Sequence, residues 1–331
     1  MPNFRAAVIV PTLAGNSVLR ECLQSLEKQN LPDFEVIVVD NSGQRLVRAE
    51  PPIRVIYNDQ NVGFGAAINQ GVRASTAPFI ATLNDDAVAD PGWLRALLTA
   101  AESRRDVGMC ASQVRLSQDS HLDSAGMLLC LDGSSKQRGH MESPSRYARQ
   151  QEVLLPSGSA ALYRREMLDE VGLFDESFFL YCEDTDLGLR ARWAGWECLY
   201  VPDAVVEHRY SHSAGKASPL KAYYVERNRL FLALKNFPAG LLMRMPFYAC
   251  ARYFWHAVFA LQGHGAAASF RTEGNSAAAL PAIVFRAHGA CISNAQRLLR
   301  DRRVIKRRLT PKQFRRLLAR FSITPRQVAA L

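Results

Sequence analysis

The sequence has no apolar run long enough to span a membrane. Residues 253–270 carry no formal charge, but two histidines, a glutamine and two glycines interrupt them, whereas a span needs roughly 20 predominantly apolar residues. Near the start, only five apolar residues separate Arg5 from Pro11, too few for the apolar core of a signal peptide. We therefore expect a protein that stays in the cytoplasm.

Cysteine patterns typical of disulfide frameworks or zinc sites are also absent. The chain has seven cysteines, an odd number, and none of them belongs to a C-x-x-C pair or to a zinc-type cluster with histidine. We expect reduced, mostly buried thiols.

Acidic residues are scarce in the last third of the chain. Residues 219–331 hold 20 Lys and Arg but three Asp and Glu, a net charge of +17, whereas residues 1–218 hold 21 against 28, a net charge of −7. A uniformly basic nucleic-acid binder is therefore disfavoured, although the overall charge is +10. The division predicts an acidic catalytic domain over 1–218 and a basic region over 219–331.

Short apolar runs alternate with amphipathic segments over the first 110 residues. Strands are expected at 6–10, 34–39, 53–57, 79–83 and 107–111. Asn16 or Ser17 is placed to cap a helix between the first two strands, and Asp90-Pro91 is expected to begin another helix. This alternation predicts an α/β domain with a sheet joined by helical crossovers.

The rest of the chain divides into a turn-rich segment and later helices. Residues 112–152 are polar and are expected to hold a hairpin. Helices are expected at 165–171 and 185–194, with short strands at 197–201 and 204–207, and residues from 219 onward read as helical.

Acidic residues end two of the expected strands. Asp40 follows an apolar run, and Asn84-Asp85-Asp86 follows the strand 79–83. Ligands of open α/β sheets bind beyond the carboxyl ends of strands, and adjacent carboxylates suit a divalent cation that bridges to a diphosphate. Alternatively, Asp40 caps its own turn and the second cluster is an acidic turn before the next helix.

Two further segments carry candidate chemistry. Residues 61–71 are rich in Gly and Ala at a helix start, where backbone N–H groups favour an anion, but they do not match the dinucleotide pattern G-x-G-x-x-G. Residues 183–186 place three carboxylates at another helix start, where an aspartate would stay ionised as a general base requires. The alternative explanation is that these acids cap the helix, but a cap requires only one of the three. His208 follows a strand-like run, and alone it is more often structural.

Seven short segments, each occurring once, follow one another along the chain in a definite order and spacing. They are Val8-Ile9-Val10-Pro11-Thr12, Val38-Val39-Asp40-Asn41-Ser42, Asn61-Val62-Gly63-Phe64-Gly65, Leu83-Asn84-Asp85-Asp86, the run 172–179, Glu183-Asp184-Thr185-Asp186-Leu187 and His208. In order and spacing they resemble family-2 glycosyltransferases over about residues 5–235. The resemblance is to the rhamnosyltransferase-like and galactofuranosyltransferase-like branch.

This resemblance implies a GT-A fold, a Rossmann-like mixed sheet flanked by helices, followed by a helical basic appendage. It also implies inverting transfer from a nucleotide-diphosphate sugar. Asp184 matches the catalytic base, and Asp86 and His208 match the ligands of Mg²⁺ or Mn²⁺. Glu183 and Trp93 are expected to contact the acceptor.

The remaining expected site residues bind the nucleotide sugar, with Asp40 accepting a hydrogen bond from the pyrimidine base; they are Pro11, Thr12, Asp40, Asn61, Gly63, Asn69, Asn84 and Asp85. One departure is Asn84, where a strict D-x-D motif has Asp. Asn at this position is common in the rhamnosyl-like branch, so we read it as variation.

The basic region mixes aromatic and cationic residues, and seven cations fall within 297–308. At about 1 kcal/mol per Lys or Arg near an anionic leaflet, it could hold the protein on the inner face of the cell membrane without spanning it. A polyprenyl-linked acceptor would be presented there. The alternative is a solvated helical bundle or a contact between copies in a homo-oligomer.

Two classes of function follow. The favoured one is a metal-dependent glycosyltransferase that extends a lipid-linked or cell-surface glycan, with dTDP-rhamnose as first donor and UDP-hexose or UDP-galactofuranose as alternatives. The other is a non-catalytic protein whose basic region binds membrane or nucleic acid. Under the favoured class we expect no nucleic-acid partner.

Overall fold

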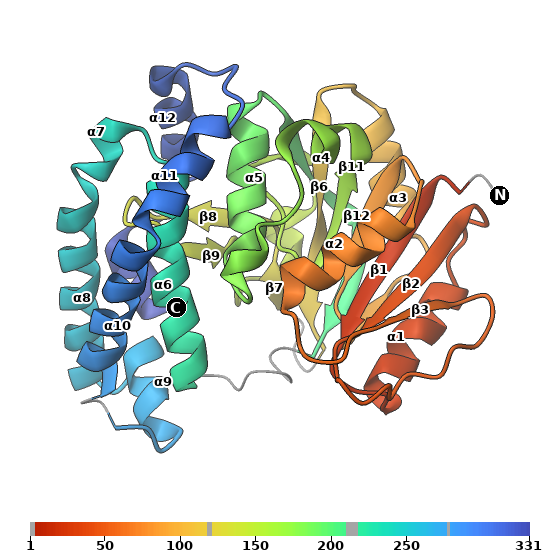
Figure 1. Cartoon of the computed structure of the whole chain (residues 1–331), viewed down its shortest axis with the longest axis horizontal. Coiled ribbons are helices and arrows are strands. Elements are labelled where there is room, and N and C mark those ends of the chain that lie inside the picture. Colours follow the sequence, from red (N-terminus) through yellow and green to blue (C-terminus); the bar gives the residue numbers. More distant parts are fainter. Residues whose placement is uncertain (1–3, 118–120, 210–217, 277–278) are drawn as a thin grey trace. The chain divides into compact units, whose positions relative to one another are not determined.

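The computed structural model describes residues 4–117, 121–209, 218–276 and 279–331, which fall into two compact units (Figure 1). The first consists of the described residues up to Met127 and those from Gln137 to Arg209. The second consists of Leu128–Lys136 and the described residues from Ser218 to Leu331. A short piece of the turn-rich segment therefore belongs with the helical end of the chain, which the sequence pattern did not indicate.

The described part of the first unit is built on a ten-stranded mixed sheet. Its strands are β1 (Ala6–Thr12), β2 (Phe34–Asp40), β3 (Arg54–Tyr57), β4 (Phe79–Leu83), β5 (Ala87–Ala89), β6 (Val107–Leu116), β7 (Leu122–Ser124), β10 (Gln151–Val153), β11 (Ala160–Arg164) and β12 (Glu197–His208). The helices are α1 (Ser17–Glu27), α2 (Phe64–Ala74), α3 (Trp93–Glu102), α4 (Arg165–Val171) and α5 (Glu183–Trp193), with short 3-10 turns η1 (Pro144–Tyr147) and η2 (Glu176–Phe178).

The strand order is β10-β12-β6-β11-β4-β1-β2-β3, with β5 on β12 and β7 on β6. β1 pairs in parallel with β2 and β4, and β2 pairs in parallel with β3, as helical crossovers require. β11 runs antiparallel between β4 and β6. The carboxyl ends of β1, β2 and β4 therefore meet the start of β11 at one edge of the sheet.

The strands expected in the first 110 residues are all present, with small shifts at their ends. Of the two expected capping candidates, Asn16 caps α1, since its side chain accepts hydrogen bonds from two backbone N–H groups, and Ser17 is the first residue of the helix. The expected helix start at Asp90-Pro91 was wrong: these residues form a turn in which Trp93 N donates to Asp90 O at 2.9 Å, and α3 begins at Trp93. The two strands expected after residue 197 are one strand, β12, with a register shift between Val201 and Val205.

Helices cover both faces of the sheet. Alternate side chains of β1 point to opposite faces, so Val8 and Val10 pack with residues of α1 and α3, whereas Ala7 and Ile9 pack with residues of α2, α4 and α5. Strands buried on both faces are apolar almost throughout. This explains why these strands lack the alternation of polar and apolar residues seen in half-exposed sheets.

The second unit combines a hairpin with helices. The hairpin pairs β8 (Met127–Leu129) with β9 (Ser135–Gln137). The helices are α6 (Pro219–Asn236), α7 (Ala239–Leu242), α8 (Met245–Leu261), α9 (Ala266–Thr272), α10 (Ala279–Ser293), α11 (Ala295–Val304), α12 (Pro311–Arg320) and α13 (Pro325–Ala330). Within the described ranges, every helix is too short or too polar to reach across a bilayer.

A buried ion network joins the hairpin to α6 and α8. Asp132, at the hairpin turn, accepts a hydrogen bond from Arg252 Nε at 2.5 Å, and Arg229 Nη1 donates to the main-chain oxygen of Asp132 at 3.0 Å. Glu226 accepts from Arg252 Nη2 at 2.8 Å and also from Arg229. All four side chains are buried, so each charge depends on its partners for compensation.

Candidate active site

The first unit brings the polar ends of its strands together. Thr12 and Asp40 are in register across β1 and β2. On the other side of β1, the chain leaves β4 and Asn84 N donates to Ser159 O at 2.8 Å, just before β11 begins. The segments that carry the expected nucleotide and metal residues therefore adjoin one another, as the parallel arrangement of the strands predicts.

Asp85 is held by a residue from β1. Thr12 Oγ1 donates to Asp85 Oδ2 at 2.6 Å. Burial raises the pKa of the Asp85 carboxyl; the Thr12 hydrogen bond opposes this shift, and the neighbouring Asp86 adds to it. Asp86 is buried and Asp85 partly buried; two adjacent carboxylates in such a position disfavour each other's charge, and a cation would relieve that repulsion.

Asp40 caps the turn that follows β2. Its two carboxylate oxygens accept hydrogen bonds from Ser42 N and Val47 N, each at 2.9 Å. Burial raises the pKa of Asp40, but these hydrogen bonds and the Ser42 side chain outweigh burial and hold the pKa below its usual value. The turn-capping alternative is therefore correct for Asp40, and contact with a pyrimidine base would have to use the remaining lone pairs.

His208 links two buried carboxylates. It ends β12, which pairs there with β5 directly after Asp86. His208 Nε2 lies 3.1 Å from Asp86 Oδ1 and 3.3 Å from Asn84 Nδ2, while Nδ1 lies 3.0 Å from Asp123 Oδ2. Burial lowers the pKa of His208, but the hydrogen bonds and charges of Asp123 and Asp86 outweigh it and raise the pKa to about 10.

Asp86, Asp123 and His208 could bind a divalent cation only if a bound molecule, such as a diphosphate, supplied further metal ligands. Asp86 and Asp123 contact different nitrogens of the His208 ring, so both carboxylates cannot share one ion with the imidazole. In the described part of the chain, no three acidic, histidine or cysteine side chains gather around one point as a preformed metal cage. One carboxylate and one imidazole fit an ion that takes its other ligands from a diphosphate and water, as Mg²⁺ usually does.

Asp184 is fixed at the start of α5. Its Oδ2 accepts a hydrogen bond from Gly158 N at 2.9 Å, and its Oδ1 accepts from Thr185 N at 2.6 Å and Thr185 Oγ1 at 3.1 Å. Burial raises the pKa of Asp184, and these hydrogen bonds oppose the shift without cancelling it. Since Gly158 directly precedes Ser159, which bonds to Asn84, this carboxylate adjoins the strand-end residues.

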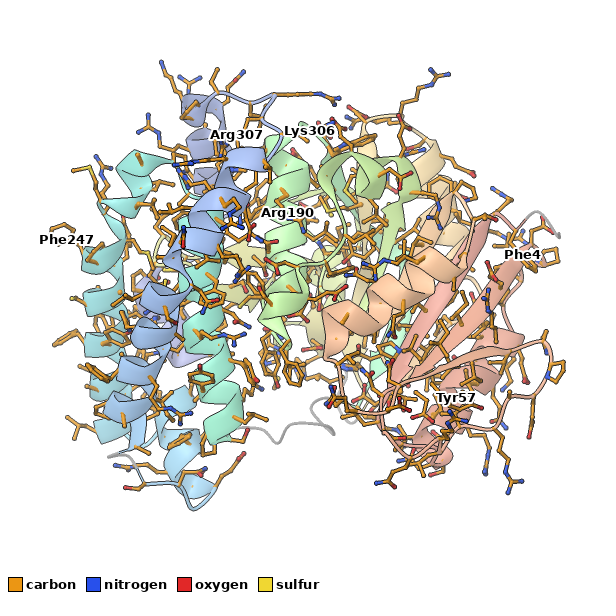
Figure 2. All side chains as sticks on the ribbon, viewed as in Figure 1. Phe4, Tyr57, Arg190, Phe247, Lys306 and Arg307 are labelled. Carbon is orange, nitrogen blue, oxygen red and sulfur yellow. The ribbon has the colours of Figure 1, made fainter. Side chains whose placement is uncertain are left out.

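The three carboxylates at the start of α5 have different surroundings. Asp186 is fully buried and pairs with Arg190, whose Nε donates to it at 2.9 Å and whose Nη2 donates to Leu173 O at 2.7 Å; Arg190 is labelled in Figure 2. Asp186 is therefore structural. Glu183 is also buried, but its Oε2 has no hydrogen-bond partner in the described structure. Burial, followed by the charge of Asp184, raises the pKa of Glu183 to about 8.

The backbone before these acids is strained. Phe179, Tyr181 and Cys182 have φ angles of 64°, 69° and 68°, in the left-handed region that non-glycine residues seldom adopt. Each such residue costs on the order of 1–3 kcal/mol and persists where the surrounding structure enforces it. Strain concentrated directly before Glu183 and Asp184 is typical of a functional site.

The Gly-rich start of α2 contacts the same strained segment. Gly63 has φ +87°, and Asn61 Oδ1 accepts a hydrogen bond from its backbone N–H at 2.9 Å. A Cβ at Gly63 would lie 2.3 Å from Phe179 O, so a larger residue cannot occupy this position without moving the strained segment. Phe64 N also donates to Phe179 O at 2.9 Å.

Two of the expected contacts do not fit the structure. Trp93 is completely buried in the core, where its Nε1 donates to Ser112 Oγ at 2.9 Å; it has no surface with which to contact an acceptor. Asn69 is also buried: it donates to Phe174 O and accepts from Phe174 N, at 2.9 and 3.0 Å. Asn69 therefore fixes the loop before α5 to α2, and we exclude it from the proposed nucleotide contacts.

Two residues of the site have no counterpart among the sequence predictions. Asp123, on β7, is an isolated acid in the turn-rich segment, and no spacing relates it to His208. Gly158 precedes β11, and its N–H matters because it anchors Asp184. Neither contact carries a signal in the sequence, since both depend on long-range packing.

Pro11, an expected nucleotide-sugar contact, lies next to Thr12 at the end of β1 and is partly exposed.

Comparison with known proteins supports the assignment of the fold and the family. A family model described as "Glycosyltransferase like family 2" matches residues 2–231. The chain is 32% identical over 256 residues to N-acetylglucosaminyl-diphospho-decaprenol L-rhamnosyltransferase of Mycobacterium tuberculosis. The matched segment covers 68% of this chain and 83% of that protein. It is 28% identical over 220 residues to the uncharacterized glycosyltransferase YwdF of Bacillus subtilis, covering 65% and 78%.

Solved structures share the fold at low sequence identity. Mannosyltransferase PcManGT from Pyrobaculum calidifontis, in complex with GDP-Man and Mn²⁺, aligns with a TM-score of 0.53 at 15% identity, covering 96% of this chain and 86% of that one. GalNAc-T7 with UDP, GalNAc and Mn²⁺ aligns with a TM-score of 0.55 at 14% identity, covering 70% and 48%. The family match sets aside the non-catalytic alternative: the chain belongs to glycosyltransferase family 2, has the GT-A fold, and is a glycosyltransferase of the hexosyltransferase type.

Proposed function

We propose that this enzyme transfers rhamnose from dTDP-rhamnose, with inversion, to a hydroxyl group of a lipid-linked glycan. The observation that carries the proposal is that Asp184, a partly exposed carboxylate with a raised pKa, is hydrogen-bonded to the segment that adjoins the Asn84-Asp85-Asp86 strand end. A candidate base and candidate diphosphate-binding groups thus belong to one edge of the sheet. The sugar and the acceptor follow the mycobacterial relative, whose name specifies both.

On the donor side, residues at the ends of β1, β2 and β4 would bind the nucleotide diphosphate. Thr12, Asp40 and Asp85 provide hydroxyl and carboxylate groups there, with Pro11 and Asn84 beside them. Gly63 and Asn61 shape the start of α2, where backbone N–H groups and the helix dipole favour a phosphate. Gly63 has no Cβ, which lets the backbone of Phe179 pack directly against the start of α2.

Asp86 and His208 would hold a divalent cation, Mg²⁺ or Mn²⁺. When bound, such an ion neutralises charge on the departing diphosphate. Asp123 would orient the His208 ring by accepting a hydrogen bond from Nδ1–H, which leaves Nε2 facing Asp86. Deprotonation of Nε2 would accompany ion binding, because imidazole ligates in its neutral form.

On the acceptor side, Asp184 would remove the proton of the attacking hydroxyl group. Its hydrogen bonds with Gly158 and Thr185 fix the direction of the carboxylate, and its raised pKa makes it a stronger base than an exposed aspartate. Glu183 would orient the acceptor through its buried Oε2, which lacks a protein partner in the described structure. Attack from the face opposite the diphosphate inverts the anomeric carbon.

Binding to a panel of nucleotide sugars, with and without Mn²⁺, tests the donor assignment. We expect dTDP-rhamnose to raise the melting temperature more than UDP-glucose, UDP-galactofuranose or GDP-mannose does, and to do so only with Mn²⁺ present. A larger shift with a UDP-sugar would replace rhamnose by that sugar and leave the site assignment intact. Binding without any requirement for a divalent ion would contradict the roles given to Asp86 and His208.

A lipid-linked acceptor implies that the enzyme works at the membrane face. Nucleotide sugars are supplied from the cytoplasm, so we place the enzyme on the inner face, held there by the basic region 219–331. This placement rests on charge: 20 Lys and Arg against three acids in this region, at about 1 kcal/mol each near an anionic leaflet.

A further inference from the structure

α8 presents a continuous apolar stripe on the outside of the second unit. Phe247, Phe254 and Leu261 are 77%, 61% and 87% exposed and lie seven residues apart, while Met243, four residues before Phe247, is 78% exposed. Cys250 fills the gap between the two phenylalanines and is exposed as well. Within α8, Phe247, Cys250, Phe254 and Leu261 share one side of the helix at 3.6 residues per turn, over about 21 Å, and Met243 lies in the turn just before the helix.

The opposite side of α8 is the packed one. Arg252 and Phe259 are buried there, and α13 contacts the helix, with Arg326 lying over the Trp255 ring at 4.9 Å from the centroid. Arg252 is the one formally charged residue from Met245 to Leu261, and it points inward to Asp132 and Glu226. The outward stripe therefore carries no charge, and Figure 2 shows Phe247 projecting away from the ribbon.

The formal charge of the second unit is mostly of one sign. Of the three acids in 219–331, Glu226 is buried against arginines and Asp301 pairs with Arg297 at 3.0 Å. Exposed cations include Arg244, between Met243 and Phe247, and Lys306 and Arg307 in the segment after α11. The unit thus combines an exposed apolar stripe with a surface on which cations far outnumber acids.

Two copies joined through this stripe would bring two strongly cationic surfaces together, with few free acids to offset them. An anionic bilayer neutralises the same charges and accepts the apolar side chains. We propose that α8 lies in the plane of an anionic membrane surface, with Met243, Phe247, Phe254 and Leu261 inserted between the lipids. This assignment deepens the proposed function, on which the choice of a lipid-linked acceptor rests, by naming the surface that reaches the membrane.

Vesicle flotation of the full chain tests the assignment. The probes are vesicles of phosphatidylcholine alone and vesicles with roughly a third phosphatidylglycerol. We expect the wild type to float with the anionic vesicles and the double variant Phe247→Ser/Phe254→Ser to lose at least about tenfold in partitioning, because two large apolar side chains no longer insert. Met141→Ser, which alters a half-exposed apolar residue of the first unit, should float as the wild type does.

Wild-type flotation by the double variant would overturn the assignment. The assignment would also be overturned if the wild type were a dimer, the double variant a monomer, and neither protein floated, because the stripe would then join two copies of the chain. Melting curves and dTDP-rhamnose binding without vesicles show whether the variant remains folded. They also separate the two proposals: if the wild type binds no nucleotide sugar, the proposed function fails while the flotation result still decides the membrane surface.

Discussion

Asp123 Oδ2 lies 3.0 Å from His208 Nδ1, and both side chains are buried at the end of β12. This contact fixes the plane of the imidazole ring and directs Nε2 toward Asp86, 3.1 Å away. Carboxylates that accept the second N–H of a ligating histidine are typical of metal sites and influence metal affinity. Asp123 is therefore a positioning residue in the account of the site given above.

Replacing Asp123 should weaken the dependence on the divalent ion rather than remove the catalytic base. We expect Asp123→Ala to raise the Mn²⁺ concentration needed for half-maximal turnover by about 10–100-fold, because the His208 ring loses its acceptor. Mn²⁺ titration by thermal shift, independent of turnover, should move in parallel. His140→Gln serves as the matched control: it alters the other imidazole beside Asp123, whose Nδ1 lies 3.2 Å from the Asp123 main-chain oxygen and 3.4 Å from Oδ1, and glutamine keeps a hydrogen-bond donor there. An unchanged Mn²⁺ requirement in Asp123→Ala would show that the contact is only structural.

Asp184→Asn tests the base directly. The amide oxygen can still accept from Gly158 N, while the amide nitrogen takes the place of the oxygen that accepts from Thr185 and can donate to Thr185 Oγ1, so the shape of the side chain is kept and proton removal is lost. We expect kcat to fall by about 10²–10⁴-fold with little change in dTDP-rhamnose affinity. Steady-state kinetics and nucleotide-sugar titration check both parts. Turnover close to wild type in this variant would rule out Asp184 as the base.

Glu183 should make stability fall as pH rises. Its pKa is raised to about 8 by burial and by Asp184, from an ordinary value near 4.5 in the unfolded chain. Below that ordinary value both states are protonated; between it and about 8 only the unfolded state loses the proton. The free energy of unfolding therefore decreases across this range, by at most about 1.4 kcal/mol per pH unit for one proton.

Urea unfolding at several pH values between 5 and 8 measures this effect. The comparison is between the wild type and Glu183→Gln, since other groups titrate equally in both. We expect the variant to lose less stability over the range and to be the more stable of the two near pH 8. Parallel pH curves for the two proteins would show that Glu183 is ionised in the native state.

The ion network of the second unit predicts a stability difference between buried and exposed arginines. Arg252→Ala removes the partner of Asp132 and Glu226, both buried, and should cost about 3–5 kcal/mol. Arg297→Ala removes a half-exposed pair with Asp301 and should cost about 1 kcal/mol or less. Chemical denaturation compares the two; similar losses would mean that the buried network is not a major source of stability.

The strand ends that hold the candidate site residues were predictable from the local sequence pattern. Asp40 and Asn84-Asp85-Asp86 each follow an apolar run, and parallel strands place such ends at one edge whatever the rest of the chain does. The start of α5 was predictable for a similar reason, because acids gather at its first turn. These features depend on a few neighbouring residues and on the handedness of crossovers.

Contacts between distant segments were not predictable in this way. Asp123 meets His208 across 85 positions of the chain, and Asp132 meets Arg252 across 120. Trp93 was given to the acceptor by resemblance, although its i,i+4 relation to Leu97 places both on the apolar side of α3, which the sheet buries. The spacing of apolar residues in the sequence therefore indicated that Trp93 is buried, but nothing in the sequence indicated the contacts of Asp123 and Asp132.

The central claim is that this enzyme transfers rhamnose through Asp184. Its most direct test is incubation with dTDP-rhamnose, Mn²⁺ and a polyprenyl-diphosphate-linked N-acetylglucosamine acceptor, with the product analysed by mass spectrometry and NMR. We predict a product with one added deoxyhexose of inverted anomeric configuration, formed by the wild type and not by Asp184→Asn. A retained configuration, or equal product from both proteins, would contradict the account.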